Sequence, residues 1–213
     1  MARRSKADAE ATREAILDAA EGLFLERGVS ATTLEQIARR AGVTRGAIYW
    51  HFSSKPDLLV AMRQRVDEPM WAWIDQRRQE LSDDPLKLMR EACSRVLERI
   101  RADRTYRNVH AIFLTRCELG DEHRADMDAV AELDERKFAA IVADFERAHA
   151  LGLLRPDISP RTATLMLFSL VQGMIGGWLR SPVRFDIRDE GEAMLSVFFN
   201  SIARRDAGIE AER

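Results

Sequence analysis

The chain has 213 residues, of which 46% are hydrophobic and 32% are charged. This length allows either one substantial core or a small module of about 50 residues joined to a larger one. Its 33 lysines and arginines are balanced by 35 acidic residues, and the resulting net charge of −2 excludes a uniformly basic coat for nucleic acid.

The first predicted helix covers about residues 10–27, because apolar residues recur at helical spacing from Ile16 to Phe24. Gly28 follows it, in the position where a left-handed residue commonly ends a helix. Three cations precede this helix: Arg3, Arg4 and Lys6.

Two short helices come next and are predicted over 33–41 and 44–51. Thr33 begins a capping box with the glutamine three positions later, and Thr44 caps the second helix. A tight turn at Gly42 joins the two. Short helices joined by a tight glycine-containing turn are typical of a helix-turn-helix.

The second short helix presents one face for DNA contact. Ile48 and Phe52 lie one turn apart and face inward, so the opposite face carries Arg45, at the end from which a recognition helix contacts bases. Arginine can donate two hydrogen bonds to O6 and N7 of guanine. From Gln36 to Lys55 the sequence has four cations and no acidic residue. The predicted DNA contacts are Thr33, Thr44, Arg45, Gly46, Ala47, Tyr49, Trp50, His51 and Lys55.

The small residues Gly46 and Ala47 let the backbone approach the groove, and Lys55 lies near a helix N-terminus that itself attracts phosphate. The alternative is a helical hairpin within a bundle, with Tyr49 and Trp50 packed as core residues. The inward face is already filled, however, and two further aromatics would then be exposed without purpose. This reasoning favours DNA contact.

Longer helices are predicted through the rest of the chain. Ser54 caps the first of them, which covers 55–79 and is expected to kink at Pro69. No stretch alternates with a period of two, so the predicted fold class is all-α with about nine helices. The remaining helices are predicted over about 85–101, 105–119, 123–151, 160–180 and 187–204.

The last two predicted helices carry more apolar surface than one chain can bury. The 160–180 helix is apolar on almost every side, and such a helix must be covered all round. A symmetric dimer is the commonest way to cover this surplus. We therefore expect a homodimer held by these two helices, disrupted by an aspartate placed at Leu195 or Phe198.

Residues 12–59 include the segment VTRGAIYWHF, with SK and L spaced after it. This stretch resembles the DNA-binding domain of the TetR family and looks closest to AcrR-like repressors of multidrug efflux. Weaker matches at 112–119 and 173–187 extend the resemblance along the chain. It implies a helix-turn-helix DNA-binding domain over 1–55, a ligand-binding and dimerisation domain over 56–213, and a dimer that binds a palindromic operator in double-stranded DNA.

The resemblance also implies that the last two helices of each subunit form an intersubunit four-helix bundle, and that the middle helices enclose a cavity for a small inducer. Apolar walls with few polar anchors suit aromatic or amphipathic compounds, and methionines adapt their shape. His110 and Gln172 are the sharper candidates, although such stripes are often plain core. The lining residues implied by position are Val66, Met70, Met89, Cys93, Val96, His110, Phe113, Leu114, Cys117, Phe138, Ile141, Phe168, Val171, Gln172 and Ile175.

Other classes of protein are disfavoured. Cys93 and Cys117 lack the spacing of a metal or redox motif, so no metal or cofactor is expected. No Gly-rich phosphate loop, nucleophile elbow or helical metalloprotease motif occurs, so we expect no catalysis. Without a signal-peptide pattern or an uninterrupted run of about 18 apolar residues, we expect a cytoplasmic protein without membrane contact.

Three functions stay open at this point. The leading hypothesis is a repressor released from its operator by an inducer, in control of a multidrug efflux operon. A TetR-type regulator of catabolism or lipid metabolism would share the DNA-binding module and differ in its pocket. A helical small-molecule-binding protein that lacks DNA binding is the third.

Overall fold

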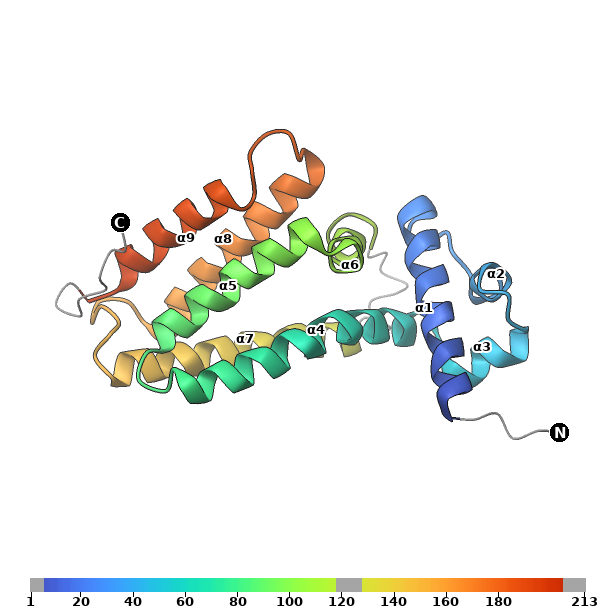
Figure 1. Cartoon of the computed structure of the whole chain (residues 1–213), viewed down its shortest axis with the longest axis horizontal. Helices are drawn as coiled ribbons and strands as arrows, with labels where there is room; N and C mark the ends of the chain where they lie inside the picture. The colour runs from blue at the N-terminus through green and yellow to red at the C-terminus, as the bar shows by residue number, and fades with distance from the viewer. Residues whose placement is uncertain (1–5, 118–127, 205–213) are drawn as a thin grey trace. The chain divides into compact units, whose positions relative to one another are not determined.

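The computed structural model describes residues 6–117 and 128–204, and every regular element in these two ranges is a helix (Figure 1). The all-α class predicted from the sequence is therefore confirmed. Outside the helices, an isolated backbone bridge joins Leu154 to Ala203. The helices are α1 (Lys6–Arg27), α2 (Leu34–Arg40), α3 (Arg45–His51), α4 (Lys55–Glu80), α5 (Pro85–Ala102), α6 (Arg104–Thr115), α7 (Asp128–Ala150), α8 (Pro160–Arg180) and α9 (Asp189–Ile202).

The chain divides into two compact units. The first comprises residues 1–68 and 105–133, and the second comprises residues 69–104 and 134–213. The first unit therefore holds α1, α2, α3, nearly all of α6 and half of α4, and α4 continues into the second unit at Pro69. Our division of the chain by function, into a DNA-binding and a ligand-binding domain, stays a prediction.

The core of the first unit forms where α1 meets the short helices. Ile16 and Phe24 of α1 are fully buried, as are Ile37 of α2 and Ile48 of α3. α2 packs against both α1 and α3. Gly28 ends α1 with a φ of +84°, as the sequence predicts, and its N–H donates to the carbonyl of Phe24 over 2.9 Å. The buried face of α1 thus supports both helices of the helix-turn-helix.

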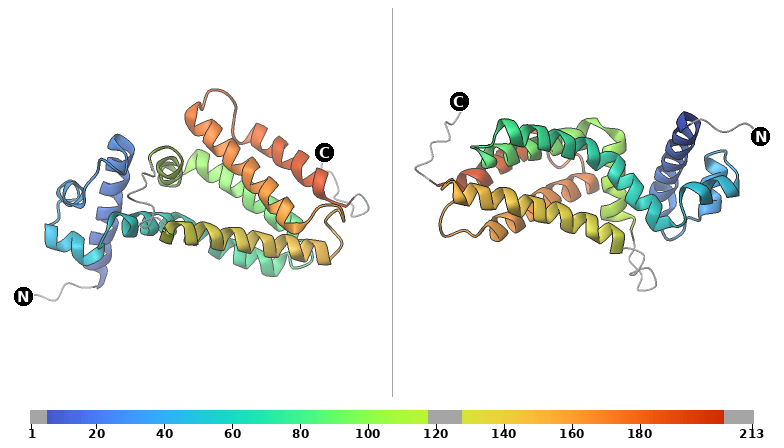
Figure 2. Two further views of the ribbon diagram at one scale, coloured as in Figure 1. Left: turned by 180° about the vertical axis from the view of Figure 1, so that it is seen from behind. Right: turned by 90° about the horizontal axis from the view of Figure 1, so that it is seen from below.

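In the second unit, α5, α8 and α9 pack side by side, as the left view of Figure 2 shows. Leu97 of α5 and Phe199 of α9 are buried there. The last part of α4 is joined to α7 by Arg78, whose guanidinium donates two hydrogen bonds of 3.1 Å to the carboxylate of Asp144. These contacts make a helical bundle.

α8 is, among the described helices, the one that is long and apolar enough to cross a membrane by length and composition. Core helices of globular proteins meet the same criterion, and α8 packs against α5 and α9. Ser159 caps it, as its hydroxyl accepts a hydrogen bond from the N–H of Thr162. We therefore describe α8 as a helix of the bundle.

The expectation that Leu195 and Phe198 hold a dimer together is wrong, because both side chains are buried within their own chain. The apolar surplus lies on other residues of the same helices. Val197 is 71% exposed, and three further apolar side chains of α8 and α9 are also exposed: Leu165, Met166 and Met194. The exposed apolar residues of α9 thus lie at other positions than those expected, and a dimer through α8 and α9 stays a prediction.

α6 ends four residues earlier than predicted, at Thr115 instead of position 119. Both Arg116 and Cys117 donate their N–H to the carbonyl of Ile112, and the carbonyl of Arg116 accepts from Val29 over 3.2 Å. The helix therefore ends where the carbonyl of Arg116 accepts a hydrogen bond from a residue outside α6. The predicted start of the next helix at 123, together with Arg3 and Arg4, lies outside the described residues.

Candidate nucleic-acid interface

The helix-turn-helix is built from two capped helices. The hydroxyl of Thr33 accepts a hydrogen bond from the N–H of Gln36 over 3.2 Å, and the Gln36 side chain accepts one from the N–H of Thr33 over 3.0 Å. Thr44 caps α3 by accepting from the N–H of Ala47 over 3.1 Å. Gly42, with a φ of +68°, makes the turn between them. The capping box and turn predicted from the sequence are confirmed.

α3 has a buried and an exposed face. Ile48 is fully buried and Phe52, at the end of the helix, is nearly so, whereas Trp50 is 73% exposed and Tyr49 is 42% exposed. The alternative in which these aromatics pack as core residues is therefore wrong. Two adjacent exposed aromatic rings on this seven-residue helix offer apolar surface to a partner. Arg45 and Gly46 share this exposure.

Two side chains of this face, Tyr49 and Arg45, contact Glu35 of α2. The hydroxyl of Tyr49 donates to Oε1 of Glu35 over 3.0 Å, and an Nη atom of Arg45 lies 3.5 Å from the same oxygen. The Arg45 guanidinium carbon also lies 5.6 Å from the centroid of the Tyr49 ring. The pKa of Glu35 is lowered, first by the hydrogen bond from its own backbone N–H and then by that from Tyr49. Glu35 thus presents an ionised carboxylate to both residues.

The other predicted contacts differ in their surroundings. Lys55 donates from its ammonium to the carbonyls of Val29 and Ser30, over 3.0 and 3.3 Å, so it ties the start of α4 to the segment between α1 and α2. His51 is half-buried, with its ring edge-on to Trp50 at 4.5 Å.

Gly46 and Ala47 leave room beside α3. A Cβ atom at Gly46 would meet no other atom within 4 Å, so the protein's own packing does not require glycine there. A hollow of about 230 Å³ lies beside Ala47, and its other lining residues are Ala9 of α1, Trp50 and His51. The absence of a side chain at Gly46 keeps this surface open to a docked backbone or groove.

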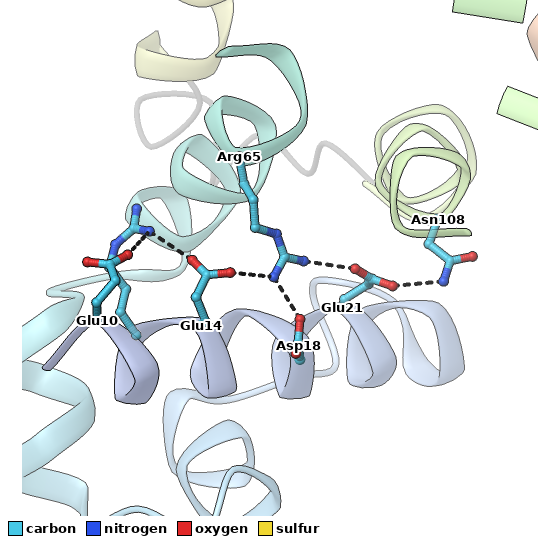
Figure 3. Close-up of polar contacts among 7 residues, drawn as sticks. Glu10, Glu14, Asp18, Glu21, Arg65 and Asn108 are labelled. Atoms are coloured by element: carbon cyan, nitrogen blue, oxygen red, sulfur yellow. Dashed lines mark hydrogen bonds and ion pairs between the residues drawn. The ribbon is translucent and has the colours of Figure 1, made fainter. Parts of the chain in front are cut away.

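α1, which supports this interface, is held by an ionic network (Figure 3). The guanidinium of Arg65 on α4 contacts three carboxylates that follow one face of α1, at 3.2 Å for Glu14, 2.7 Å for Asp18 and 3.0 Å for Glu21. Asn108 of α6 donates to the second oxygen of Glu21 over 2.8 Å. One buried carboxylate therefore joins α1 to both α4 and α6.

Five predicted inducer-lining residues lie in the first unit, and they differ in burial. Val66 and His110 are buried, and Nδ1 of His110 lies 2.9 Å from the carbonyl of Tyr106, one turn earlier. Phe113 lies beneath the guanidinium of Arg63 at 5.0 Å. Two residues near the end of α6 are more accessible, and they are Leu114 and Cys117.

The remaining ten lie in the second unit. Of these, Met70, Met89, Cys93 and Ile175 are buried, and Val96, Phe138, Ile141, Phe168, Val171 and Gln172 are half-buried. The rings of Phe138 and Phe168 meet edge to face at 6.1 Å. Burial, and to a smaller degree the charge of Glu192, raises the pKa of Cys93 to about 12. The Cys93 side chain is therefore a protonated thiol that contributes apolar surface and does not act as a nucleophile.

Sequence reasoning missed Glu35 and Arg65. Glu35 precedes the acid-free stretch and pairs with a tyrosine 14 positions later, a spacing that carries no helical signal. Arg65 contacts residues 44 to 51 positions earlier. The one sequence signal for this network was the repeat of acidic residues along α1, at Glu14, Asp18 and Glu21.

A capped α2, a tight turn and an α3 with an exposed basic and aromatic face define a helix-turn-helix transcriptional regulator. Residues 16–62 match the profile of "Bacterial regulatory proteins, tetR family", and residues 84–203 match that of "MAATS-type transcriptional repressor, C-terminal region". The chain belongs to the TetR family of bacterial regulatory proteins, as its resemblance indicates. Members of this family are transcriptional regulators.

Individual relatives are similar to this protein along nearly the whole chain. It is 32% identical over 197 residues to the HTH-type transcriptional regulator AcrR of Shigella flexneri, covering 92% of each. It matches the crystal structure of NalD, the secondary repressor of the MexAB-OprM multidrug efflux pump in Pseudomonas aeruginosa, with a TM-score of 0.82 and 38% identity over 94% of this chain and 100% of NalD. The SmeT–triclosan complex matches with a TM-score of 0.78 and 32% identity, covering 92% and 93%. SmeT is the repressor of the Stenotrophomonas maltophilia multidrug efflux pump SmeDEF.

Proposed function

We propose that this chain is a cytoplasmic, non-enzymatic, dimeric repressor of a multidrug efflux operon, released from its operator by a small aromatic or amphipathic compound. The exposed face of α3, with Arg45, Tyr49 and Trp50 turned outward, is the observation that carries the proposal. The efflux repressors NalD and SmeT, with which it shares the fold along its length, support the choice of target.

In this proposal, α3 enters the major groove. Arg45 donates to a guanine, and Tyr49 and His51 contact phosphates. The hydroxyls of Thr33 and Thr44 use an oxygen lone pair as helix caps and retain a hydrogen that can bond a phosphate oxygen. Gly46, Ala47, Trp50 and Lys55 complete the proposed contact set.

The dimer would form through α8 and α9. Their exposed apolar residues, led by Val197, supply apolar surface that a two-fold interface would bury. Two recognition helices related by that axis would bind a palindrome with half-sites about 34–36 Å apart, or a multiple of this distance.

The inducer would bind among the predicted lining residues. Triclosan, an aromatic compound, occupies the related repressor SmeT, and the edge-to-face pair of Phe138 and Phe168 offers aromatic surface in this chain. Gln172, half-buried in the same unit as this pair, is the polar side chain proposed to orient it. A regulator of catabolism or lipid metabolism would use the same DNA face and differ in the compound that it binds.

The proposal is tested by selecting a duplex from a random library with the wild-type chain and measuring its binding by fluorescence anisotropy. Arg45→Ala is expected to lower affinity and to relax the preference at one base pair, at a cost of about 1–3 kcal/mol. Arg184→Ala, an exposed arginine between α8 and α9, is the matched control and should bind normally. Failure of the wild-type chain to select any sequence would favour a binding protein that lacks DNA recognition.

A further inference from the structure

Glu35 places a negative charge in the proposed DNA-binding face. Its carboxylate lies on α2, at the edge of a stretch from position 36 to position 55 that contains no acidic residue. Any contact with DNA brings this carboxylate toward phosphates, which repel it. The Glu35 carboxylate contributes to the first turn of α2 by accepting from its own backbone N–H, but it also accepts from Tyr49 of α3, which helix capping does not explain.

One oxygen of Glu35 engages two of the α3 side chains that are proposed to contact DNA. Oε1 accepts the Tyr49 hydroxyl at 3.0 Å and lies 3.5 Å from an Nη atom of Arg45. The side chains of Arg45 and Glu35 are both exposed, so a nucleic acid can reach the pair. Arg45 therefore meets DNA with an anion already beside it.

The two modes of DNA binding use Arg45 differently. If Arg45 contacted a phosphate, it would exchange one anion, the Glu35 carboxylate, for another. Such an exchange adds little binding free energy, and it leaves the Glu35 carboxylate facing the negatively charged DNA backbone. A guanine edge uses only two of the five N–H donors of a guanidinium, and the others can stay with Glu35. Pairing with Glu35 is thus compatible with base contact and opposed to backbone contact.

We propose that Glu35 is a specificity-determining residue, which holds Arg45 and Tyr49 by a shared carboxylate oxygen so that Arg45 contacts bases in operator DNA and is kept from phosphates in other DNA. This inference rests on the proposed DNA-binding function. The ligand is the same duplex DNA. The inference adds Glu35 as a residue that raises specificity by weakening binding to non-operator sequences.

The test replaces Glu35 by glutamine, which keeps the size of the side chain and an oxygen that accepts from Tyr49. Binding to the selected operator duplex and to a scrambled duplex of the same composition is measured against salt concentration. Arg45 freed from Glu35 becomes one more phosphate contact on scrambled DNA, so the slope of log K against log salt steepens by about 0.9. This corresponds to about 3.5-fold more affinity lost between about 50 and 200 mM salt. Affinity for scrambled DNA rises at low salt, and affinity for the operator does not rise with it.

Two controls separate this effect from a change in net charge. Glu26→Gln removes a carboxylate of the same unit, which pairs with Arg40 over 2.9 Å between α1 and α2, and whose exposed fraction of 48% is close to the 43% of Glu35. It should leave the salt slope on scrambled DNA unchanged. In an Arg45→Ala background, Glu35→Gln should also have no effect on that slope, because the proposed action passes through Arg45.

The outcomes are distinct. A steeper slope and tighter binding on scrambled DNA, absent from both controls, support the proposal. An unchanged slope, an equal gain in Glu26→Gln, or a gain that persists without Arg45 overturns it, as does a loss of operator binding with scrambled binding unaltered. If the wild-type chain shows no preference for its selected duplex, the proposed function fails first, and this result is separate from the others.

Discussion

Replacing Arg65 by alanine should loosen α1 from α4 and α6. The substitution removes the guanidinium that contacts Glu14, Asp18 and Glu21. The side chain of Glu21 is only 12% exposed and retains its hydrogen bond from Asn108, but it loses its contact with the Arg65 cation. Removing one partner of a buried pair costs about 3–5 kcal/mol, because the other charge stays buried.

The expected cost is at the lower end of this range, about 3 kcal/mol. Asn108 still donates a hydrogen bond to Glu21. The carboxylates of Glu14 and Asp18 are more exposed, so the loss of their ion pairs lowers the free energy of unfolding by less than about 1 kcal/mol each. Amide hydrogen exchange in α1, measured by mass spectrometry, reports this local opening directly. A cost of 3 kcal/mol corresponds to exchange faster by about 150-fold, since about 1.4 kcal/mol is tenfold.

Asp18→Asn is the matched control, because it removes a partner of Arg65 whose side chain is 71% exposed. It should accelerate exchange in α1 by no more than about fivefold. Exchange in Arg65→Ala within about threefold of the wild type would refute the reasoning, since Glu21 would then not depend on this cation.

Three further predictions concern the DNA face, the dimer and the thiols. Gly46→Val should abolish operator binding in a mobility-shift assay while the thermal transition stays, because its Cβ meets no protein atom; normal binding would show that α3 does not approach DNA there. Val197→Asp should give a folded monomer in sedimentation, whereas Leu195→Asp should unfold the bundle, because the first side chain is exposed and the second is buried; a dimeric Val197→Asp would contradict the proposed interface. Burial raises the pKa of Cys93 to about 12 and that of Cys117 to about 11, so both should react with a thiol reagent at pH 8 far more slowly than free cysteine; labelling at the rate of free cysteine would contradict this.

The sequence predicted the elements of this fold well, because their signals are local. The capping box at Thr33, the stop at Gly28 and the N-cap at Thr44 depend on residues within a few positions of one another. The end of α6 was missed because the carbonyl of Arg116 bonds to Val29, which is far away in sequence. Local patterns contain no information on such a partner.

The proposed site shows the same division. The outward position of Tyr49 and Trp50 followed from the two apolar residues on the opposite face of α3. The contact of Glu35 with Arg45 and Tyr49 could not be predicted, because it depends on the angle between α2 and α3. For Leu195, periodicity showed that the residue is apolar and buried, but it cannot distinguish burial within a chain from burial against a partner.

The most direct test of the account is a calorimetric titration of the chain with triclosan, in the absence and in the presence of its selected operator duplex. A repressor released by an inducer requires a coupling of about 1–3 kcal/mol between the two sites, so operator DNA should weaken triclosan binding by about 5–150-fold. By linkage, triclosan must weaken operator binding by the same factor. Triclosan binding with equal affinity in both titrations would contradict release by an inducer at this site.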